Sequence, residues 1–104
     1  MRMVTIVYKL LSLFPEDEKF GLVSQIKRSP ISIPSNIAEG YGRNYRKDYA
    51  RFLQIARGSL FELQTQFQIA VNLNFIEQED LFQVKNLSIE IEKMLNILIK
   101  KLVD

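Results

Sequence analysis

The sequence predicts an all-α fold, an antiparallel up-down-up-down four-helix bundle built as a single domain over residues 1–104. Apolar residues recur three or four positions apart along most of the chain, as they do in helices that bury one face. No alternating run rich in Val, Ile and Thr lies between turn residues, so no strand is predicted. The length is typical of one domain, and the short connections favour antiparallel packing of successive helices.

The first predicted helix covers about residues 3–13 and ends before Pro15, because the residue that precedes a proline disfavours the helical conformation. The second begins near Asp17 and ends at Gly40–Gly42, since glycine commonly follows the last helical turn. Prolines at positions 30 and 34 interrupt it. We expect one long kinked helix here, because two short helices would bury less apolar surface.

The third predicted helix starts between Asn44 and Lys47 and breaks near Asn74. Its spacing alternates between four and three residues over about six turns, like the seam of a coiled coil. The seam consists of Tyr49, Leu53, Ala56, Leu60, Leu63, Phe67 and Ala70.

The fourth predicted helix has a similar seam, made of Leu81, Val84, Ser88, Ile91, Leu95, Leu98 and Leu102. In total, 13 of the 23 residues from 81 to 103 are apolar, which exceeds what one buried face needs. We expect part of this surface to contact another subunit. The alternative is a last helix that its own bundle wraps more deeply than average.

Cysteine and histidine are both absent from the chain. Their absence excludes disulfides, thiolate nucleophiles, Cys- or His-ligated metal sites and serine–histidine triads. Carboxylate catalysis needs two acids at a defined separation, but apart from Glu39 and Glu62 the acids lie at predicted helix starts or on a solvated face. We therefore expect no enzymatic activity, no metal and no cofactor.

No apolar stretch approaches the roughly 20 residues that cross a bilayer. The N-terminus also lacks the apolar core and cleavage site of a signal peptide. We expect a cytoplasmic protein without membrane contact.

Positive charge is concentrated in the middle third of the chain. Residues 27–58 hold seven basic side chains and two acidic ones, whereas the whole chain has a net charge of +2. Such an excess favours an anionic partner, and we expect nucleic acid. The candidate contacts, with helix pairing as an alternative role for the last three, are Arg43, Arg46, Lys47, Arg51, Lys27, Arg28 and Arg57.

Three tyrosines, Tyr41, Tyr45 and Tyr49, alternate with these cations. Tyrosine rings stack on unpaired bases, so the mixture is typical of a site for RNA or single-stranded nucleic acid. A solvated charged loop with its tyrosines tucked into the bundle would have the same composition. In a ring of subunits the site would be repeated, which would raise avidity.

A polar stripe in the second predicted helix is formed by Ser32, Ser35, Asn36 and Glu39. It is either a line of binding or catalytic groups or, as we favour, a set that hydrogen-bonds the neighbouring helix and backbone freed by the prolines. In that interpretation Glu39 pairs with an arginine such as Arg43 or Arg51.

Gly58 and Ser59 lie in the middle of the third predicted helix, where glycine costs about 1 kcal/mol in helix propensity. We expect Gly58 to admit the close approach of the Lys27–Pro30 segment. Glu62, one turn later, is expected to pair with Arg28.

Three segments carry a family resemblance: residues 14–28 (FPEDEKFGLVSQIKR), 32–43 (SIPSNIAEGYGR) and 52–63 (FLQIARGSLFEL). They resemble the 23S rRNA intervening-sequence proteins, a family that includes the accessory variability determinant of diversity-generating retroelements. The resemblance implies a four-helix bundle assembled as a barrel-like homopentamer. It also implies a basic surface that, in the retroelement relatives, binds nucleic acid and a reverse transcriptase.

The resemblance supplies no catalytic residue, and the chain departs from it in a shorter first helix. Its signature positions, which have no assigned chemistry, are Ser32, Asn36, Glu39, Gly58, Ser59 and Glu62. Together, the residues and the resemblance predict a non-enzymatic homo-oligomer that binds nucleic acid, with RNA as the expected ligand. The alternative is a scaffold that recruits a partner enzyme such as a reverse transcriptase and makes no direct nucleic-acid contact.

Overall fold

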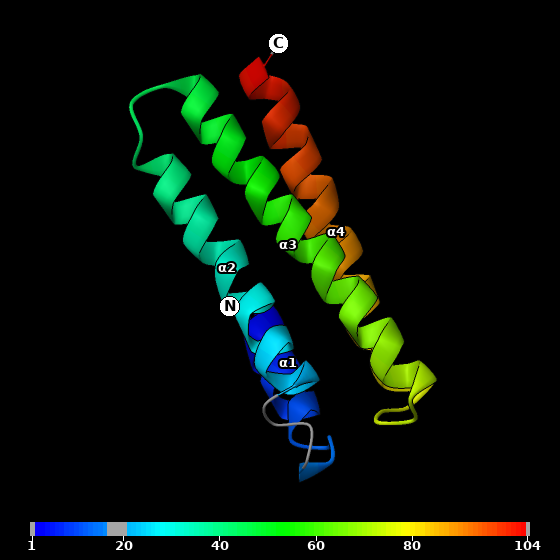
Figure 1. Ribbon diagram of the computed structural model, residues 1–104. Coiled ribbons are helices and arrows are strands. Elements are labelled where there is room, and N and C mark those ends of the chain that lie inside the picture. Colours follow the sequence, from blue (N-terminus) through cyan, green and yellow to red (C-terminus); the bar gives the residue numbers. More distant parts are fainter. Residues whose placement is uncertain (1, 17–20, 104) are drawn as a thin grey trace.

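The computed structural model describes residues 2–16 and 21–103, and these residues form four α-helices and no strand. The helices, labelled in Figure 1, are α1 (Arg2–Leu11), α2 (Leu22–Tyr41), α3 (Arg46–Asn72) and α4 (Gln78–Val103). The predicted all-α class is confirmed.

Successive helices run in opposite directions along a body whose longest dimension is 44 Å (Figure 1). The backbones of α1 and α3 each lie beside those of α2 and α4, whereas neither diagonal pair, α1 with α3 or α2 with α4, brings its backbones close together within the described residues. This is the predicted up-down-up-down order. Because α1 has 10 residues and α4 has 26, α1 covers only part of the bundle, and its Arg2 lies near Gln83 and Glu90. Beyond that point α2, α3 and α4 continue without it (Figure 1).

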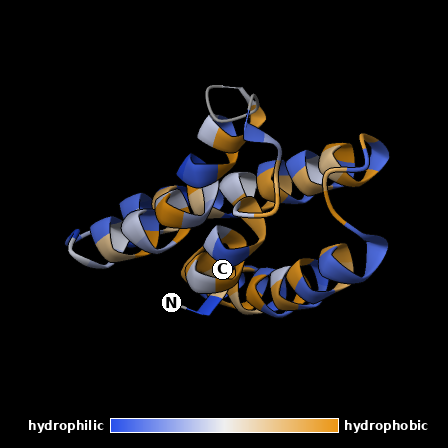
Figure 2. Cartoon of the chain, turned by 90° about the horizontal axis from the view of Figure 1, so that it is seen from below, coloured by the Kyte–Doolittle hydropathy of each residue, from blue (hydrophilic) through white to orange (hydrophobic). Residues whose placement is uncertain are grey.

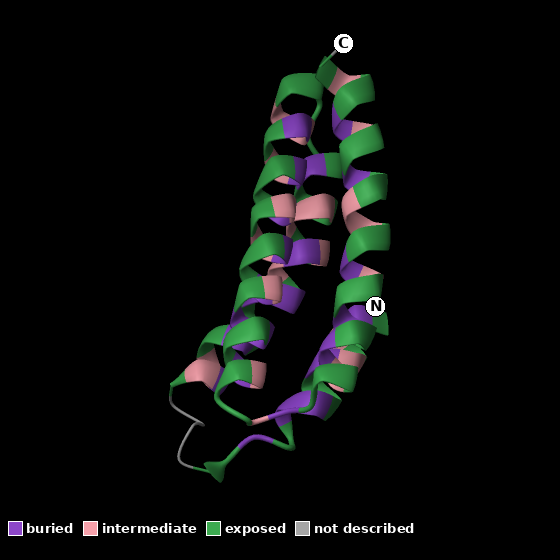
Figure 3. Ribbon diagram, turned by 90° about the vertical axis from the view of Figure 1, so that its right-hand side faces the viewer, coloured by how far each residue is buried: buried purple, intermediate pink, exposed green. Residues whose placement is uncertain are grey.

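The core follows the two predicted seams. In α3 every seam residue is buried except Tyr49, which is half-buried. In α4 the seam is buried at four positions and half-buried at Ile91, Leu98 and Leu102. Buried residues lie on the inner sides of the helices (Figure 3), and polar and apolar residues alternate in bands along each helix (Figure 2).

α2 is one helix that contains Pro30 and Pro34, as predicted. Its start differs from the prediction: Asp17 lies outside the described residues, and Gly21 lies in a turn, so α2 begins at Leu22.

The glycine that permits close packing of α2 and α3 is Gly40, and the prediction for Gly58 was wrong. A Cβ atom on Gly40 would lie 2.8 Å from Phe52 Cβ and 2.9 Å from Tyr49 Cδ1, whereas one on Gly58 would meet no atom within 4 Å. Gly40 lies inside the last turn of α2, and Gly42 caps the helix. The small residue is needed where the two helix backbones come closest, and helix propensity alone does not locate that point.

The connection between α3 and α4 reverses the chain near Asn74, as predicted. Asn74 has a φ of 62°, a left-handed conformation that asparagine tolerates. α4 then starts from a cap in which the Asp80 carboxylate accepts a hydrogen bond from the Glu77 N–H at 3.0 Å. This reversal returns the end of α4 to the start of α3.

Candidate nucleic-acid interface

Four of the predicted contacts lie together at one end of the bundle, at the connection from α2 to α3 (Figure 1). The last turn of α4, which carries two lysines, lies at the same end. All of these basic side chains are exposed. We call them the basic end: Arg43, Arg46, Lys47, Arg51, Lys100 and Lys101.

Arg46 joins the start of α3 to the end of α4. Its Nη2 donates a hydrogen bond to the Lys101 carbonyl oxygen at 2.5 Å. Carbonyls in the last turn of a helix lack a helical donor, and a cation there is favoured by the helix dipole. Sequence reasoning missed Lys100 and Lys101 as neighbours of Arg46 because Lys101 is 55 positions away. The available signal was the antiparallel return of the last helix.

Arg43 and Arg51 share one aromatic ring. Their Cζ atoms lie 5.1 and 4.9 Å from the centroid of the Phe52 ring, within the range of cation–π attraction. The two guanidinium groups are therefore no farther apart than the sum of those distances. Arg43 Nη2 also donates to Glu39 Oε1 at 2.6 Å, which confirms the predicted pairing of Glu39 with an arginine. An ion pair this exposed contributes little to stability.

Lys47 and Arg51 line a depression of about 400 Å³, and Val103 from the end of α4 also lines it. Asp48 lies in the same depression, in the first turn of α3, where the helix dipole favours a carboxylate. Asp48 and Glu39 are far outnumbered by the cations, so this end of the bundle has a marked positive charge.

Two of the three interleaved tyrosines point into solvent. Tyr41 is 78% exposed and Tyr45 is 71% exposed, whereas Tyr49 is half-buried. The Tyr41 and Tyr49 rings meet edge to face, with centroids 6.0 Å apart and an interplanar angle of 82°. The alternative in which the tyrosines are tucked into the bundle is therefore wrong for Tyr41 and Tyr45.

The three remaining candidates lie away from the basic end. Lys27 Nζ lies 5.9 Å from the centroid of the Tyr8 ring on α1. Arg57 Nη1 donates to Asn96 Oδ1 at 2.8 Å and so links α3 to α4. Helix packing thus involves Lys27 and Arg57, the alternative role weighed for them. Arg28 is exposed on the first half of α2.

Ser32, Asn36 and Ser59 form a hydrogen-bonded group between α2 and α3. The Oγ atoms of Ser32 and Ser59 lie 2.9 Å apart, and Asn36 Nδ2 donates to Ser32 O at 2.8 Å and to Ser32 Oγ at 2.9 Å. The predicted pairing of the polar stripe with its neighbouring helix is confirmed here. The two prolines instead free the carbonyls of Ile26 and Pro30, so Asn36 does not compensate for them.

Glu62 contacts Gln66, and the predicted pair with Arg28 is not formed within the described residues. Gln66 Nε2 donates to Glu62 Oε1 at 3.1 Å, and Ser29 Oγ donates to Gln66 Oε1 at 3.3 Å. Ser29 is 3% exposed and faces α3, whereas its neighbour Arg28 points to solvent. The predicted pair was wrong because α2 is rotated by one residue, so that Ser29 and not Arg28 faces α3.

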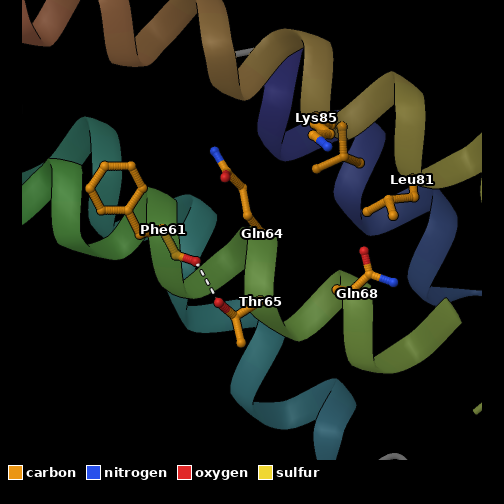
Figure 4. Close-up of a pocket in the computed structure, with 7 residues that line it drawn as sticks. Phe61, Gln64, Thr65, Gln68, Leu81 and Lys85 are labelled. Atoms are coloured by element: carbon orange, nitrogen blue, oxygen red, sulfur yellow. Dashed lines mark hydrogen bonds between the residues drawn. The ribbon is translucent and has the colours of Figure 1, made fainter. Parts of the chain in front are cut away.

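A second depression, of about 380 Å³, lies between α3 and α4 toward the opposite end of the molecule (Figure 4). Its lining has no acidic side chain and consists of Phe61, Gln64, Thr65, Gln68, Leu81, Val84 and Lys85. Across residues 2–16 and 21–103, no three His, Cys, Asp or Glu side chains are grouped so that they could hold a metal ion. Nor does any helix in these ranges combine the length and apolarity needed to cross a membrane.

Comparison with known proteins agrees with this fold. Residues 1–97 match the family model for the 23S rRNA-intervening sequence protein. A crystal structure from Bacteroides thetaiotaomicron, of a protein with unknown function from the S23 ribosomal protein family, is 32% identical. The similarity covers 94% of this chain and 91% of that chain, with a TM-score of 0.83. No curated protein is significantly similar. Since the family match covers nearly the whole chain, the chain belongs to the family of 23S rRNA-intervening sequence proteins.

Proposed function

We propose that this chain is a non-enzymatic protein that binds RNA through Arg43, Arg46, Lys47 and Arg51. The observation that carries the proposal is the concentration of these exposed cations at one end of the bundle. Cations that neutralise phosphates release counterions, which favours binding to any nucleic acid. Membership of the 23S rRNA-intervening sequence family supports RNA as the ligand. We also expect the protein to act in the cytoplasm, where it would meet such an RNA.

Charge reversal at three of these positions tests the proposal. The triple variant Arg43→Glu, Arg46→Glu and Lys47→Glu is expected to lower the affinity for a structured RNA by about 100-fold or more. Affinity of the unchanged protein should fall steeply as salt rises. Fluorescence anisotropy at two salt concentrations, with the structured RNA and a duplex DNA as probes, measures both effects.

The matched control reverses three exposed lysines elsewhere: Lys9→Glu, Lys85→Glu and Lys93→Glu. It changes the net charge by the same amount. If only the first variant loses RNA affinity, the loss is due to where the charges lie and not to the net charge. Equal losses in the two variants would mean that only net charge matters. Circular dichroism melting curves establish that both variants remain folded.

We infer further that copies of the chain associate, with a homopentamer as the expected assembly. Large apolar side chains are exposed along α4, as the sequence predicted, and such patches commonly mark protein interfaces. They are 40–69% exposed and comprise Phe82, Ile89, Met94, Ile97 and Val103.

Two glutamates placed on this surface should break the association. Light scattering during size-exclusion chromatography should give an oligomer for the unchanged protein and a smaller species for Met94→Glu with Ile97→Glu, because a buried charge without a partner is costly. Gln83→Glu with Asn86→Glu adds the same charge at exposed polar positions of α4 and should leave the mass unchanged. A double variant that is folded and still fully assembled would contradict this interface.

A second candidate function is a scaffold that recruits a partner enzyme such as a reverse transcriptase. The same exposed α4 residues favour it, because they fit a different protein as well as a second copy. A scaffold would associate with RNA only in the partner's presence and with little dependence on salt. Absence of RNA binding at low salt would leave this candidate in place of direct binding.

A further inference from the structure

Two tyrosines at the basic end have exposed rings that do little to stabilise the fold. Tyr41 and Tyr45 are 78% and 71% exposed, so their rings contribute little to the core. Tyr41 is nevertheless oriented, because its ring meets the half-buried ring of Tyr49 edge to face at 6.0 Å. An oriented, solvent-facing ring is a ready surface on which a flat partner can stack.

The cations around these rings are also held in place. Arg43 and Arg51 both lie against the ring of Phe52, at 5.1 and 4.9 Å. Arg46 is held by its hydrogen bond to the carbonyl of Lys101. Side chains that are already ordered lose less conformational entropy when they bind a phosphate.

The hydrogen bond from Arg46 also extends the charged surface onto a third helix end. It places the last turn of α4, with exposed Lys100 and Lys101, beside the first turn of α3. Val103 from the same turn lines the depression that contains Lys47 and Arg51. Positive charge therefore continues from the end of α2, across the start of α3, to the end of α4.

We propose that the basic end binds unpaired nucleotides: Tyr41 and Tyr45 stack on bases, and Lys100 and Lys101 extend the path of phosphate contacts begun by the α2–α3 connection. This inference rests on the proposed RNA binding and adds the class of RNA and two further pairs of residues. A base that is paired in a duplex already has its faces covered by its neighbours, whereas an unpaired base can leave its stack for a tyrosine ring. Stacking on an aromatic ring tolerates any base, so little sequence preference is expected.

The stacking half of the proposal is tested with fluorescein-labelled single-stranded oligoadenylate RNA and a blunt RNA duplex of equal length. Tyr41→Ala with Tyr45→Ala should lower affinity for the single strand by at least about 25-fold and change affinity for the duplex little. Tyr41→Phe with Tyr45→Phe keeps both rings and should restore single-strand binding. A probe of the same length with abasic sites should bind the unchanged protein and the alanine variant equally.

The phosphate half of the proposal is tested by Lys100→Gln with Lys101→Gln. Loss of two phosphate contacts should reduce the slope of log affinity against log salt by about 1.4 for the single strand. Lys85→Gln with Lys93→Gln removes two exposed lysines of α4 that lie away from the basic end and should leave the slope unchanged.

The outcomes separate this inference from the proposed function. Single-strand binding that survives the alanine variant, or that the phenylalanine variant fails to restore, overturns stacking while leaving RNA binding by the arginines intact. If the slope of log affinity against log salt is unchanged in the Lys100 and Lys101 variant, the end of α4 makes no phosphate contacts. No binding of any probe at low salt overturns both the inference and the proposed function.

Discussion

Replacing Phe67 with alanine is expected to lower the free energy of unfolding by about 3–5 kcal/mol. Phe67 is 0% exposed and is the largest fully buried side chain among the described residues. Its ring packs edge-on against Phe14, with centroids 6.4 Å apart, and Phe14 in turn lies 5.6 Å from Phe75. The substitution therefore opens a cavity where the segment after α1, α3 and the α3–α4 connection meet. Urea denaturation followed by circular dichroism measures the loss.

Phe61→Ala is the matched control, because it removes the same side chain from the same helix. Phe61 is 45% exposed, so its replacement should cost about 1 kcal/mol or less. Similar losses for the two variants would show that Phe67 is not the centre of the core. Measuring both at low protein concentration keeps self-association from contributing to the difference.

Replacing Gly40 with alanine is expected to destabilise the protein by about 1–3 kcal/mol, even though alanine is the better helix former. The new Cβ atom would lie 2.8 Å from Phe52 Cβ, an atom that is attached to the backbone and cannot rotate away. The end of α2 must therefore move away from α3. Phe52 also orients Arg43 and Arg51, so the same variant should bind RNA more weakly.

Gly58→Ala is expected to stabilise the protein, in contrast to Gly40→Ala. A Cβ atom there meets nothing within 4 Å, and the position is exposed in the middle of α3. Alanine should therefore raise the free energy of unfolding by up to about 1 kcal/mol and leave RNA affinity unchanged. Thermal and urea unfolding of the two variants make the comparison. A Gly40→Ala variant as stable as Gly58→Ala would contradict the close contact between α2 and α3.

Much of the candidate site was predictable because its members are close in sequence. Arg43, Arg46 and Lys47 flank one short connection, so they stay together however the helices pack. The contact between Glu39 and Arg43 is also local, since residues four apart lie on one side of a helix.

Long-range parts of the site were not predictable in this way. Lys100 and Lys101 join the basic end only because α4 returns alongside α3 for nearly its whole length. Solvent exposure of Tyr41 and Tyr45 depends likewise on where the end of α2 lies relative to α3, which no local pattern records.

By itself the sequence determined the number of helices, their alternating directions and the residues of the two long apolar seams. These features are local: the spacing of apolar residues, the glycines at helix ends and the short connections each shape one helix or one connection, wherever the other helices lie. Only the tertiary structure decided which side of each helix meets which neighbour. With 3.6 residues per turn, a shift of one residue exchanges Ser29 for Arg28 at the α2–α3 interface. That rotation, together with the point of closest approach at Gly40, is set by how all four helices pack at once.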